Sequence, residues 1–153
     1  MSLISRIFVD TNILVEATDS DRTFHIQSLS LLESGWSARR LKLYSSTQVW
    51  REYLVVATRP TASNGMGLSP TQALNNIAEF RKCIELVPES IQAWEELARL
   101  VEEHRLVGKR IHDANLVTTA RLSGINTILT INTKDFVSLP ITAIHPEDLV
   151  LKL

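Results

Sequence analysis

Short strand-like segments alternate with longer helical segments along this chain, and this alternation restricts the possible folds more than any other feature. The strand-like segments are residues 6–9, 41–45, 83–87, 127–131 and 141–144. The helical segments are residues 23–40, 46–58 and 69–82, one that follows Ser90, and one from His112 or Asp113 to Gly124. Strands separated by helices are typical of a parallel sheet that is covered on both faces. We therefore expect an α/β fold, a three-layer α/β/α sandwich with a central parallel sheet.

Local signals place several helix boundaries. Ser69 offers a hydroxyl cap, and Pro70 follows at a position where its missing N–H is harmless. Ser90 caps the next helix, and Gly124 is typical of a left-handed C-terminal cap. Residues 58–70 collect Pro, Gly, Ser and Asn, which predicts a loop between two helices. For the helix after Ser90 we expect an apolar face formed by Ile91, Trp94, Leu97, Ala98 and Val101.

The length and composition predict one ordinary globular domain over residues 1–153. Hydrophobic residues make up 44% and charged residues 22%, as in most globular proteins. No apolar run approaches the ~20 residues that span a bilayer, so we expect no membrane association. Cys83 has no second cysteine with which to form a disulfide, so we expect a cytoplasmic location. The net charge is -1, so nucleic-acid binding would require a local basic patch or metal ions.

Four acidic residues lie where a parallel sheet gathers its ligands, near the carboxyl ends of strands. Asp10 directly follows the first strand in the stretch "IFVDTNILVEA", and Asp135 lies in "TINTKDF" after a later strand. Asp113 begins a helix after the turn "LVGKRIH", and Glu52 lies within the second helix beside its apolar face. We expect these four acids to converge on one crevice.

Converging carboxylates repel one another, and their desolvation is unfavourable unless a cation neutralises them. The expected cation is Mg²⁺ or Mn²⁺, because both prefer oxygen ligands and take few carboxylates from the protein. Zinc fits less well, since a single cysteine adds nothing and the histidines show no metal-binding spacing. The histidines are His25, His104, His112 and His145.

Each of these acids also has a purely structural interpretation. Asp10 would cap a turn, and Asp113 would be an ordinary helix N-cap. Glu52 would be a solvated helix residue, and Asp135 a turn residue. The other acids near these segments are interpreted as surface or cap residues: Glu16, Asp19, Asp21, Glu147 and Asp148.

Taken together, the segments resemble a PIN domain, the fold of the VapC-like toxin ribonucleases in bacterial and archaeal toxin–antitoxin pairs. The resemblance extends from Ile7 to Leu149, and its motifs occur in the family's order and with similar separations. The matching stretches are "FVDTNILV", "QVWREYLVVATRP", "IHDANLVTTARLSGINTILTINTKDF" and "HPEDL".

The resemblance also implies roles for individual residues. The catalytic positions of the family fall on Asp10, Glu52, Asp113 and Asp135, and the metal ligands among them on Asp10, Asp113 and Asp135. Some relatives have an acid where this chain has Asn132, so the resemblance leaves the fourth role open between Asn132 and Asp135. The hydroxyl and amide groups that would orient the acids fall on Thr11, Asn12, Thr130 and Asn132. The family further implies a homodimer, a small antitoxin partner and an RNA substrate.

The function predicted on this basis is a Mg²⁺- or Mn²⁺-dependent endoribonuclease that cleaves RNA phosphodiesters with an activated water. One alternative is a non-catalytic module of the same fold that binds RNA or protein. Another is an aspartyl phosphotransferase, which requires a second Asp two residues after the first, where this chain has Asn12. Lys109, Arg110 and Lys134 adjoin the acids in sequence and are candidates for RNA contact, or else solvated turn residues.

Overall fold

A computed structural model describes residues 5–37 and 40–153 and contains one sheet of five parallel strands. The strands are β1 (Ser5–Val9), β2 (Leu41–Ser45), β3 (Ile84–Leu86), β4 (Thr127–Leu129) and β5 (Thr142–Ile144). Their order across the sheet is β3-β2-β1-β4-β5, so β1 is the central strand. The predicted parallel sheet is confirmed.

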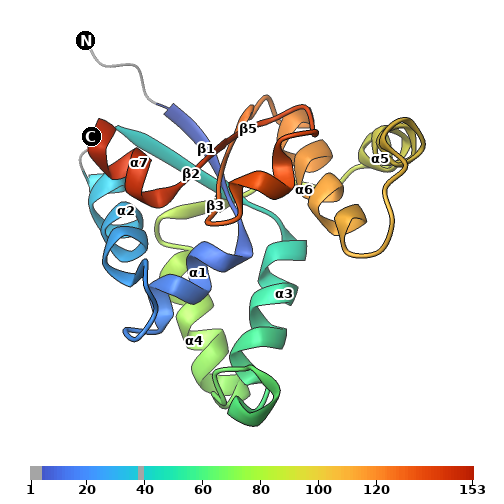
Figure 1. The fold of residues 1–153 in the computed structure, drawn as a ribbon. Helices are drawn as coiled ribbons and strands as arrows, with labels where there is room; N and C mark the ends of the chain where they lie inside the picture. Colours follow the sequence, from blue (N-terminus) through green and yellow to red (C-terminus); the bar gives the residue numbers. More distant parts are fainter. Residues whose placement is uncertain (1–4, 38–39) are drawn as a thin grey trace.

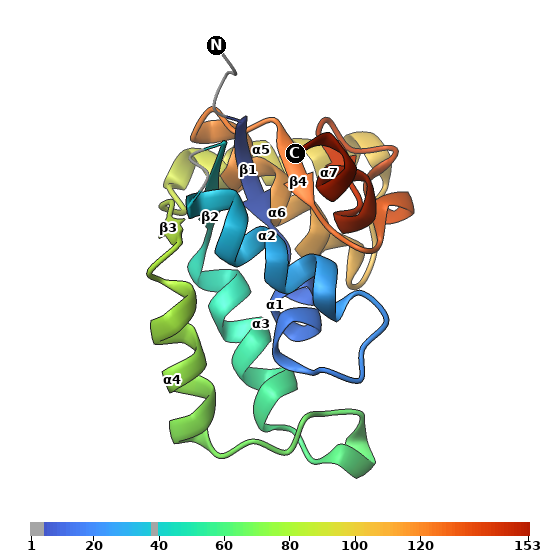
Figure 2. The ribbon, with the colours of Figure 1, turned by 90° about the vertical axis from the view of Figure 1, so that its left-hand side faces the viewer.

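Helices cover both faces of this sheet, which confirms the three-layer α/β/α architecture (Figure 1). The helices are α1 (Thr11–Thr18), α2 (His25–Ser37), α3 (Thr47–Thr58), α4 (Pro70–Phe80), α5 (Ile91–His104), α6 (Arg110–Leu122) and α7 (Pro146–Lys152). Two 3-10 turns, η1 (Thr61–Ser63) and η2 (Thr133–Phe136), lie between them. On one side α2 packs against β2, α1 and α7, and on the other α5 packs against α6. The paired helices α3 and α4 run side by side away from the sheet (Figure 2).

The hydrophobic core surrounds the central strand. Ile7, Phe8 and Val9 of β1 are almost completely buried, as are Ile128 and Leu129 of the neighbouring β4. Burial on both faces explains why residues 7–9 of β1 are all apolar rather than alternating with polar residues. A rigid, buried strand therefore ends directly before Asp10.

The predicted helix boundaries at Ser69, Ser90 and Gly124 are confirmed. The Ser69 hydroxyl accepts a hydrogen bond from the backbone N–H of Gln72 within a complete capping box. The Ser90 hydroxyl accepts one from the N–H of Ala93. Gly124 has φ +74°, the left-handed conformation that glycine adopts without strain.

Two short helices, α1 and α7, are absent from the sequence-based prediction. Helix α1 begins directly after β1, and Ile13, Leu14 and Val15 are buried within it. A segment that is buried all round shows no helical periodicity, so its apolar run resembles the strand before it. The predicted helix over residues 23–40 is observed as α2, while residues 38 and 39 lie outside the described part of the chain.

The apolar face predicted for α5 is only partly correct, because Leu97 is buried and Val101 is partly buried but the rest of that face is not. Ile91 is 81% exposed and Trp94 is 66% exposed, whereas the buried residues are Ala93, Leu97 and Leu100. Helix α5 packs mainly on α6, so the stripe of residues that it buries is not its most hydrophobic stripe.

Among the described helices, none is long and apolar enough to cross a membrane.

Candidate active site

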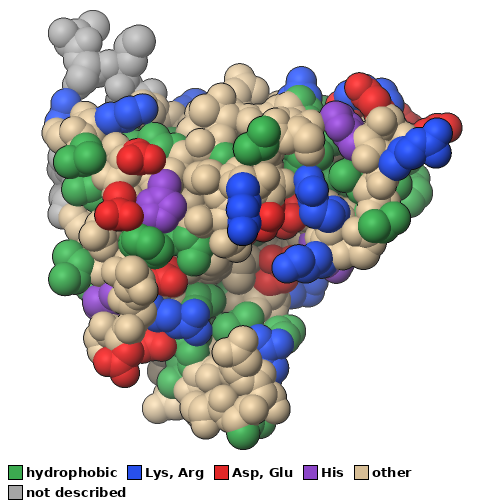
Figure 3. Space-filling model, viewed as in Figure 1, with side chains coloured by type: hydrophobic (Ala, Val, Ile, Leu, Met, Phe, Trp, Pro, Cys, Tyr) green, Lys and Arg blue, Asp and Glu red, His purple; other side chains and the backbone are tan. Residues whose placement is uncertain are grey.

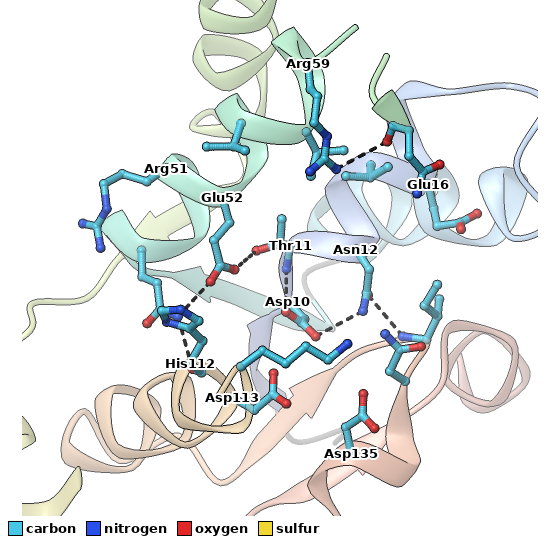
Figure 4. A pocket seen from close by; sticks show the side chains of 18 of the residues that line it. Asp10, Thr11, Asn12, Glu16, Arg51, Glu52, Arg59, His112, Asp113 and Asp135 are labelled. Atoms are coloured by element: carbon cyan, nitrogen blue, oxygen red, sulfur yellow. Dashed lines mark hydrogen bonds between the residues drawn. The ribbon is translucent and has the colours of Figure 1, made fainter. Parts of the chain in front are cut away.

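A cleft of about 870 Å³ opens at the carboxyl edge of the sheet, and all four predicted acids line it (Figure 4). Asp10 enters from the end of β1, Glu52 from α3, Asp113 from α6 and Asp135 from η2. Figure 4 shows Asp113 and Asp135 on the side of the cleft opposite Glu52, with Asp10 between them. The structure thus brings together carboxylates that are far apart in sequence.

Asp10 is held at the junction of strand and helix by three hydrogen bonds. Its Oδ1 accepts from the backbone N–H of Thr11 at 2.7 Å, as the N-cap of α1. Its Oδ2 accepts from Thr130 Oγ1 at 2.8 Å and from Asn12 Nδ2 at 3.2 Å. The side chain is only 8% exposed, so both oxygens have fixed directions. The structural interpretation of Asp10 as a cap is correct, and the same carboxylate also lines the cleft.

Asn12 and Thr130 connect the segments that follow β1 and β4. Asn12 Nδ2 donates to Thr130 Oγ1 at 3.0 Å, and Asn12 Oδ1 accepts from the backbone N–H of Ile131 at 3.2 Å. Thr130 Oγ1 also accepts from the N–H of Asn132 at 3.1 Å. Thr130 is fully buried, so this network holds the Asp10 carboxylate from behind. Asn132 contributes its backbone to the network, and the residue also lines the cleft.

Glu52 is oriented by two donors, one on each oxygen. Thr11 Oγ1 donates to Oε2 at 2.7 Å, and Gln48 Nε2 donates to Oε1 at 3.0 Å. Gln48 is 3% exposed and is itself held by Asn115 Nδ2, which donates to its Oε1, and by the carbonyl of His112. Glu52 is therefore not a freely solvated helix residue. The sequence analysis did not identify Gln48 as a partner of Glu52. Its position four residues before Glu52 was a usable signal, because side chains at that spacing lie side by side on a helix.

Asp113 and Asp135 are positioned differently. In the described part of the chain, neither carboxylate accepts a hydrogen bond. Asp113 lies three residues into α6, so its interpretation as the helix N-cap is wrong. Asp135 lies in η2, which is tied to α6 because Arg110 Nη2 donates to the Asp135 carbonyl at 3.1 Å.

Burial and mutual repulsion raise the pKa of two of these carboxyls to about 6. For Asp10, desolvation is the main cause, and the hydrogen bonds from Thr130 and Thr11 oppose it. For Asp113, desolvation is again the main cause, followed by the negative charge of Asp135. Lys109 and Arg110 act in the opposite direction on Asp113. The cleft therefore holds more negative charge than its own cations neutralise, which is favourable for a bound cation.

The donor set of the cleft fits an open magnesium-type site. In residues 5–37 and 40–153, no three Asp, Glu, His or Cys side chains stand close enough to form a ready-made metal cage. Mg²⁺ needs no such cage, since it commonly binds through one or two carboxylates and keeps several waters. Asp10, Asp113 and Asp135 could supply those carboxylates, and the side chains of the cleft include no thiolate that would favour a softer metal.

The candidate RNA-contact residues occupy three different settings. Lys109, four residues before Asp113, lines the cleft. Arg110 turns toward η2, where it also donates to Ser138 Oγ. Lys134 is exposed and lies outside the cleft lining.

Glu16, which the sequence suggested to be a surface or cap residue, is in fact buried. It is 4% exposed, lines the cleft, and accepts a hydrogen bond from the backbone N–H of Phe24 at 3.0 Å. This bond fixes the turn between α1 and α2. The sequence around Glu16 offers no signal for this role, because the partner lies eight residues away in the turn before α2.

The central strand β1 places a carboxylate in an acidic cleft, and two helices and a 3-10 turn add further acids. The chain is therefore an α/β protein with a cluster of acids at the carboxyl edge of its parallel sheet. Residues 7–140 match the PIN domain family, and the chain belongs to that family. No curated protein sequence matches the chain.

Solved toxin–antitoxin structures share the fold. The chain is similar to VapBC2 from Rickettsia felis bound to a promoter DNA fragment, with 18% identity and a TM-score of 0.65 over 92% of this chain and 98% of that one. DNA-bound VapBC from Salmonella typhimurium is 18% identical, with a TM-score of 0.65 over 94% of this chain and 99% of that one. VapC20 from Mycobacterium tuberculosis, described as a Sarcin-Ricin loop cleaving toxin, is 16% identical, with a TM-score of 0.59 over 80% of this chain and 86% of that one. PIN domain toxins are generally nucleases, and PIN nucleases typically use divalent metals.

Proposed function

We propose that this chain is a Mg²⁺- or Mn²⁺-dependent endoribonuclease and the toxin of a toxin–antitoxin pair. The observation that carries the proposal is the convergence of Asp10, Glu52, Asp113 and Asp135 on one cleft. Membership of the PIN domain family and the similarity in fold to VapC toxins support it.

Asp10, Asp113 and Asp135 are the proposed metal ligands. When bound, the cation would lower the pKa of a water and balance the charge that develops on the phosphate. Two features of the chain prepare Asp10 for this role: its three hydrogen bonds fix its direction, and the rigid end of β1 fixes its position. The carboxylates of Asp113 and Asp135 make no hydrogen bond within the described residues, so their carboxylate oxygens are free for a ligand.

Glu52 is the proposed acceptor of the proton of the attacking water. Each of its oxygens already accepts one hydrogen bond, which leaves further lone pairs available within the cleft. Attack of the water oxygen on phosphorus breaks the bond to the 3′ oxygen and yields a 5′-phosphate and a 3′-hydroxyl. Lys109 is placed beside Asp113 to contact a phosphate oxygen.

The proposed biological unit is a single domain over residues 1–153 that forms a homodimer in the cytoplasm. The partner proposed from the toxin–antitoxin complexes of similar fold is a small antitoxin that blocks the cleft. RNA is the proposed substrate, and Lys109, Arg110 and Lys134 remain its candidate contacts.

Metal-dependent cleavage of single-stranded RNA by the purified chain tests the proposal. Asp113→Asn removes one proposed ligand and should lower kcat by about a hundredfold or more. Asp148→Asn is the matched control, because Asp148 is exposed in α7 and away from the cleft. Loss of cleavage on chelation, restored by Mg²⁺ or Mn²⁺ alone, is the expected result. RNA binding without cleavage under every metal condition would instead support the non-catalytic alternative.

A further inference from the structure

The cleft extends from the acids along α3 toward a second region. This far region consists of Val15 on α1, Val55 and Val56 on α3, the C-cap residue Arg59 of α3, and Asn64 in the following turn. Figure 4 shows Arg59 at the end of the cleft away from Asp113 and Asp135. In Figure 3, acidic side chains lie in the middle of the molecule with basic side chains around them. Substrate that reaches the acids must therefore pass cationic groups.

The loop after α3 holds Arg59 in place. The backbone N–H of Gly67 donates to the Arg59 carbonyl at 2.9 Å, and the N–H of Met66 donates to the carbonyl of Val56 at 3.0 Å. A Cβ at Gly65 would stand 2.0 Å from the Arg59 carbonyl oxygen and 2.5 Å from Arg59 Cβ, so only glycine fits there. Asn64 is in the left-handed conformation with φ 63°, which turns its carbonyl toward the guanidinium. The loop is thus folded tightly back onto this one residue.

The charge of Arg59 has no carboxylate partner among the described residues. Its Nη2 donates to the neutral carbonyl of Asn64 at 3.3 Å, and its Nε is buried without any hydrogen-bond partner. Arg22, another cation of the cleft, is by contrast paired with Asp19 at 3.3 Å. A half-buried guanidinium that keeps unused donors is a ready site for an anion, because a phosphate accepts two parallel N–H bonds from it.

We propose that Arg59 binds a backbone phosphate of the RNA at a distance from the scissile one. The apolar side chains of Val15, Val55 and Val56 line the cleft beside it and would contact the sugar or base of the nucleotide between the two phosphates. Val55 is 59% exposed, as a residue with this role must be. This inference rests on the proposed function and identifies a part of the same cleft that anchors the substrate strand. Because the contact is to phosphate, it acts on every sequence alike.

The test measures binding without cleavage. Fluorescein-labelled polyuridine is titrated with Asp113→Asn protein and with the same protein carrying Arg59→Gln, over a series of salt concentrations and without divalent metal. Arg59→Gln should weaken binding about tenfold and lower the slope of log Kd against log salt by about 0.7. Arg59→Lys keeps the charge and should keep the slope. Arg81→Gln, an equal loss of charge at an exposed site on the end of α4, should change neither quantity.

The results separate this inference from the proposed function. Equal slopes for the parent and Arg59→Gln, or no binding by either, would overturn the phosphate site even if the wild-type chain cleaves RNA. A slope that falls only with Arg59→Gln would support the site even if no cleavage is found. Thermal unfolding of each variant shows that the compared proteins are folded.

Discussion

The two sides of the acidic cleft are built in different ways. On one side, Asp10 and Glu52 accept five hydrogen bonds between them from Thr11, Asn12, Gln48 and Thr130. On the other, the carboxylates of Asp113 and Asp135 accept none within the described residues, and their charges repel each other. The first side is arranged before any ligand arrives, whereas the second depends on a cation for its neutralisation. The comparison shows that one part of an acidic site can be positioned in advance by hydrogen bonds, while the other part is neutralised only when a cation binds.

The pH dependence of stability should show the largest effect. Asp10 and Asp113 have a pKa of about 6 in the folded chain against an ordinary value of 3.8. Between these values the folded state binds more protons than the unfolded state, so the free energy of unfolding falls as the pH rises from about 4 to about 6. Above that window it stays level. Without metal we expect a loss of about 3 kcal/mol from the buried Asp10 and a smaller loss from Asp113, whose charge is partly screened by solvent, measured by urea unfolding. A free energy of unfolding that rises with pH across this window would contradict the shifts.

Thr130→Val should weaken the hydrogen-bonded side alone. Valine has the shape of threonine but can neither donate to Asp10 nor accept from Asn12 and Asn132. The loss of such orienting partners commonly lowers metal affinity or activity 10- to 100-fold, and we expect a fall in kcat/KM of about that size. The matched control is Ser138→Ala, which removes one hydroxyl contact of Arg110 on the other side and should change activity little. Equal losses in both variants would show that the two sides do not differ in this way.

Asp10→Asn and Asp113→Asn should both remove an unfavourable charge at pH 7 without metal, but only Asp10→Asn disturbs hydrogen bonds. Asn at position 113 relieves repulsion and breaks no hydrogen bond, so the free energy of unfolding should rise by about 1 kcal/mol after allowance for solvent screening. Asn at position 10 removes a buried charge, which raises stability, but it places an N–H₂ group against the donor Asn12 Nδ2, which costs about 1–3 kcal/mol. The two effects should nearly cancel, so stability should change less than at position 113. Urea unfolding at pH 7 in a chelator measures both. A larger rise for Asp10→Asn than for Asp113→Asn would refute the contrast.

The smallest expected effect concerns the two lysines next to the acids. Lys109 lines the cleft and Lys134 does not, so their contributions to RNA binding should differ. Lys109→Gln should lower the salt slope of polyuridine binding by about 0.7, and Lys134→Gln should leave it unchanged. Metal affinity should be nearly the same in both. Slopes lowered equally in the two variants would show that the exposed η2 turn also contacts RNA, and slopes equal to that of the wild type would show that Lys109 makes no phosphate contact.

Much of the fold was predictable because it follows from local patterns. The alternation of apolar strands and helices predicted the parallel sheet, and Ser69, Ser90 and Gly124 marked helix ends through hydrogen bonds to residues at most four positions away. The segment of α1 was hidden because it is buried all round. The face predicted for α5 was only partly correct, because Leu97 is buried but the more hydrophobic Ile91 and Trp94 do not meet α6.

The sequence by itself determined which residues are acids, where the strands and most of the helices lie, and that a carboxylate ends the first strand. These properties depend on the chemistry of one residue and its near neighbours. Only the tertiary structure decided that Thr130 supports Asp10 across 120 positions and that Thr11 supports Glu52 across 41. It also decided that Glu16 is buried, that Asp113 is not the N-cap of α6, and that the loop after α3 folds back on Arg59. Such contacts arise when helices pack on a sheet, and no local pattern encodes them because the partners meet only in the folded chain.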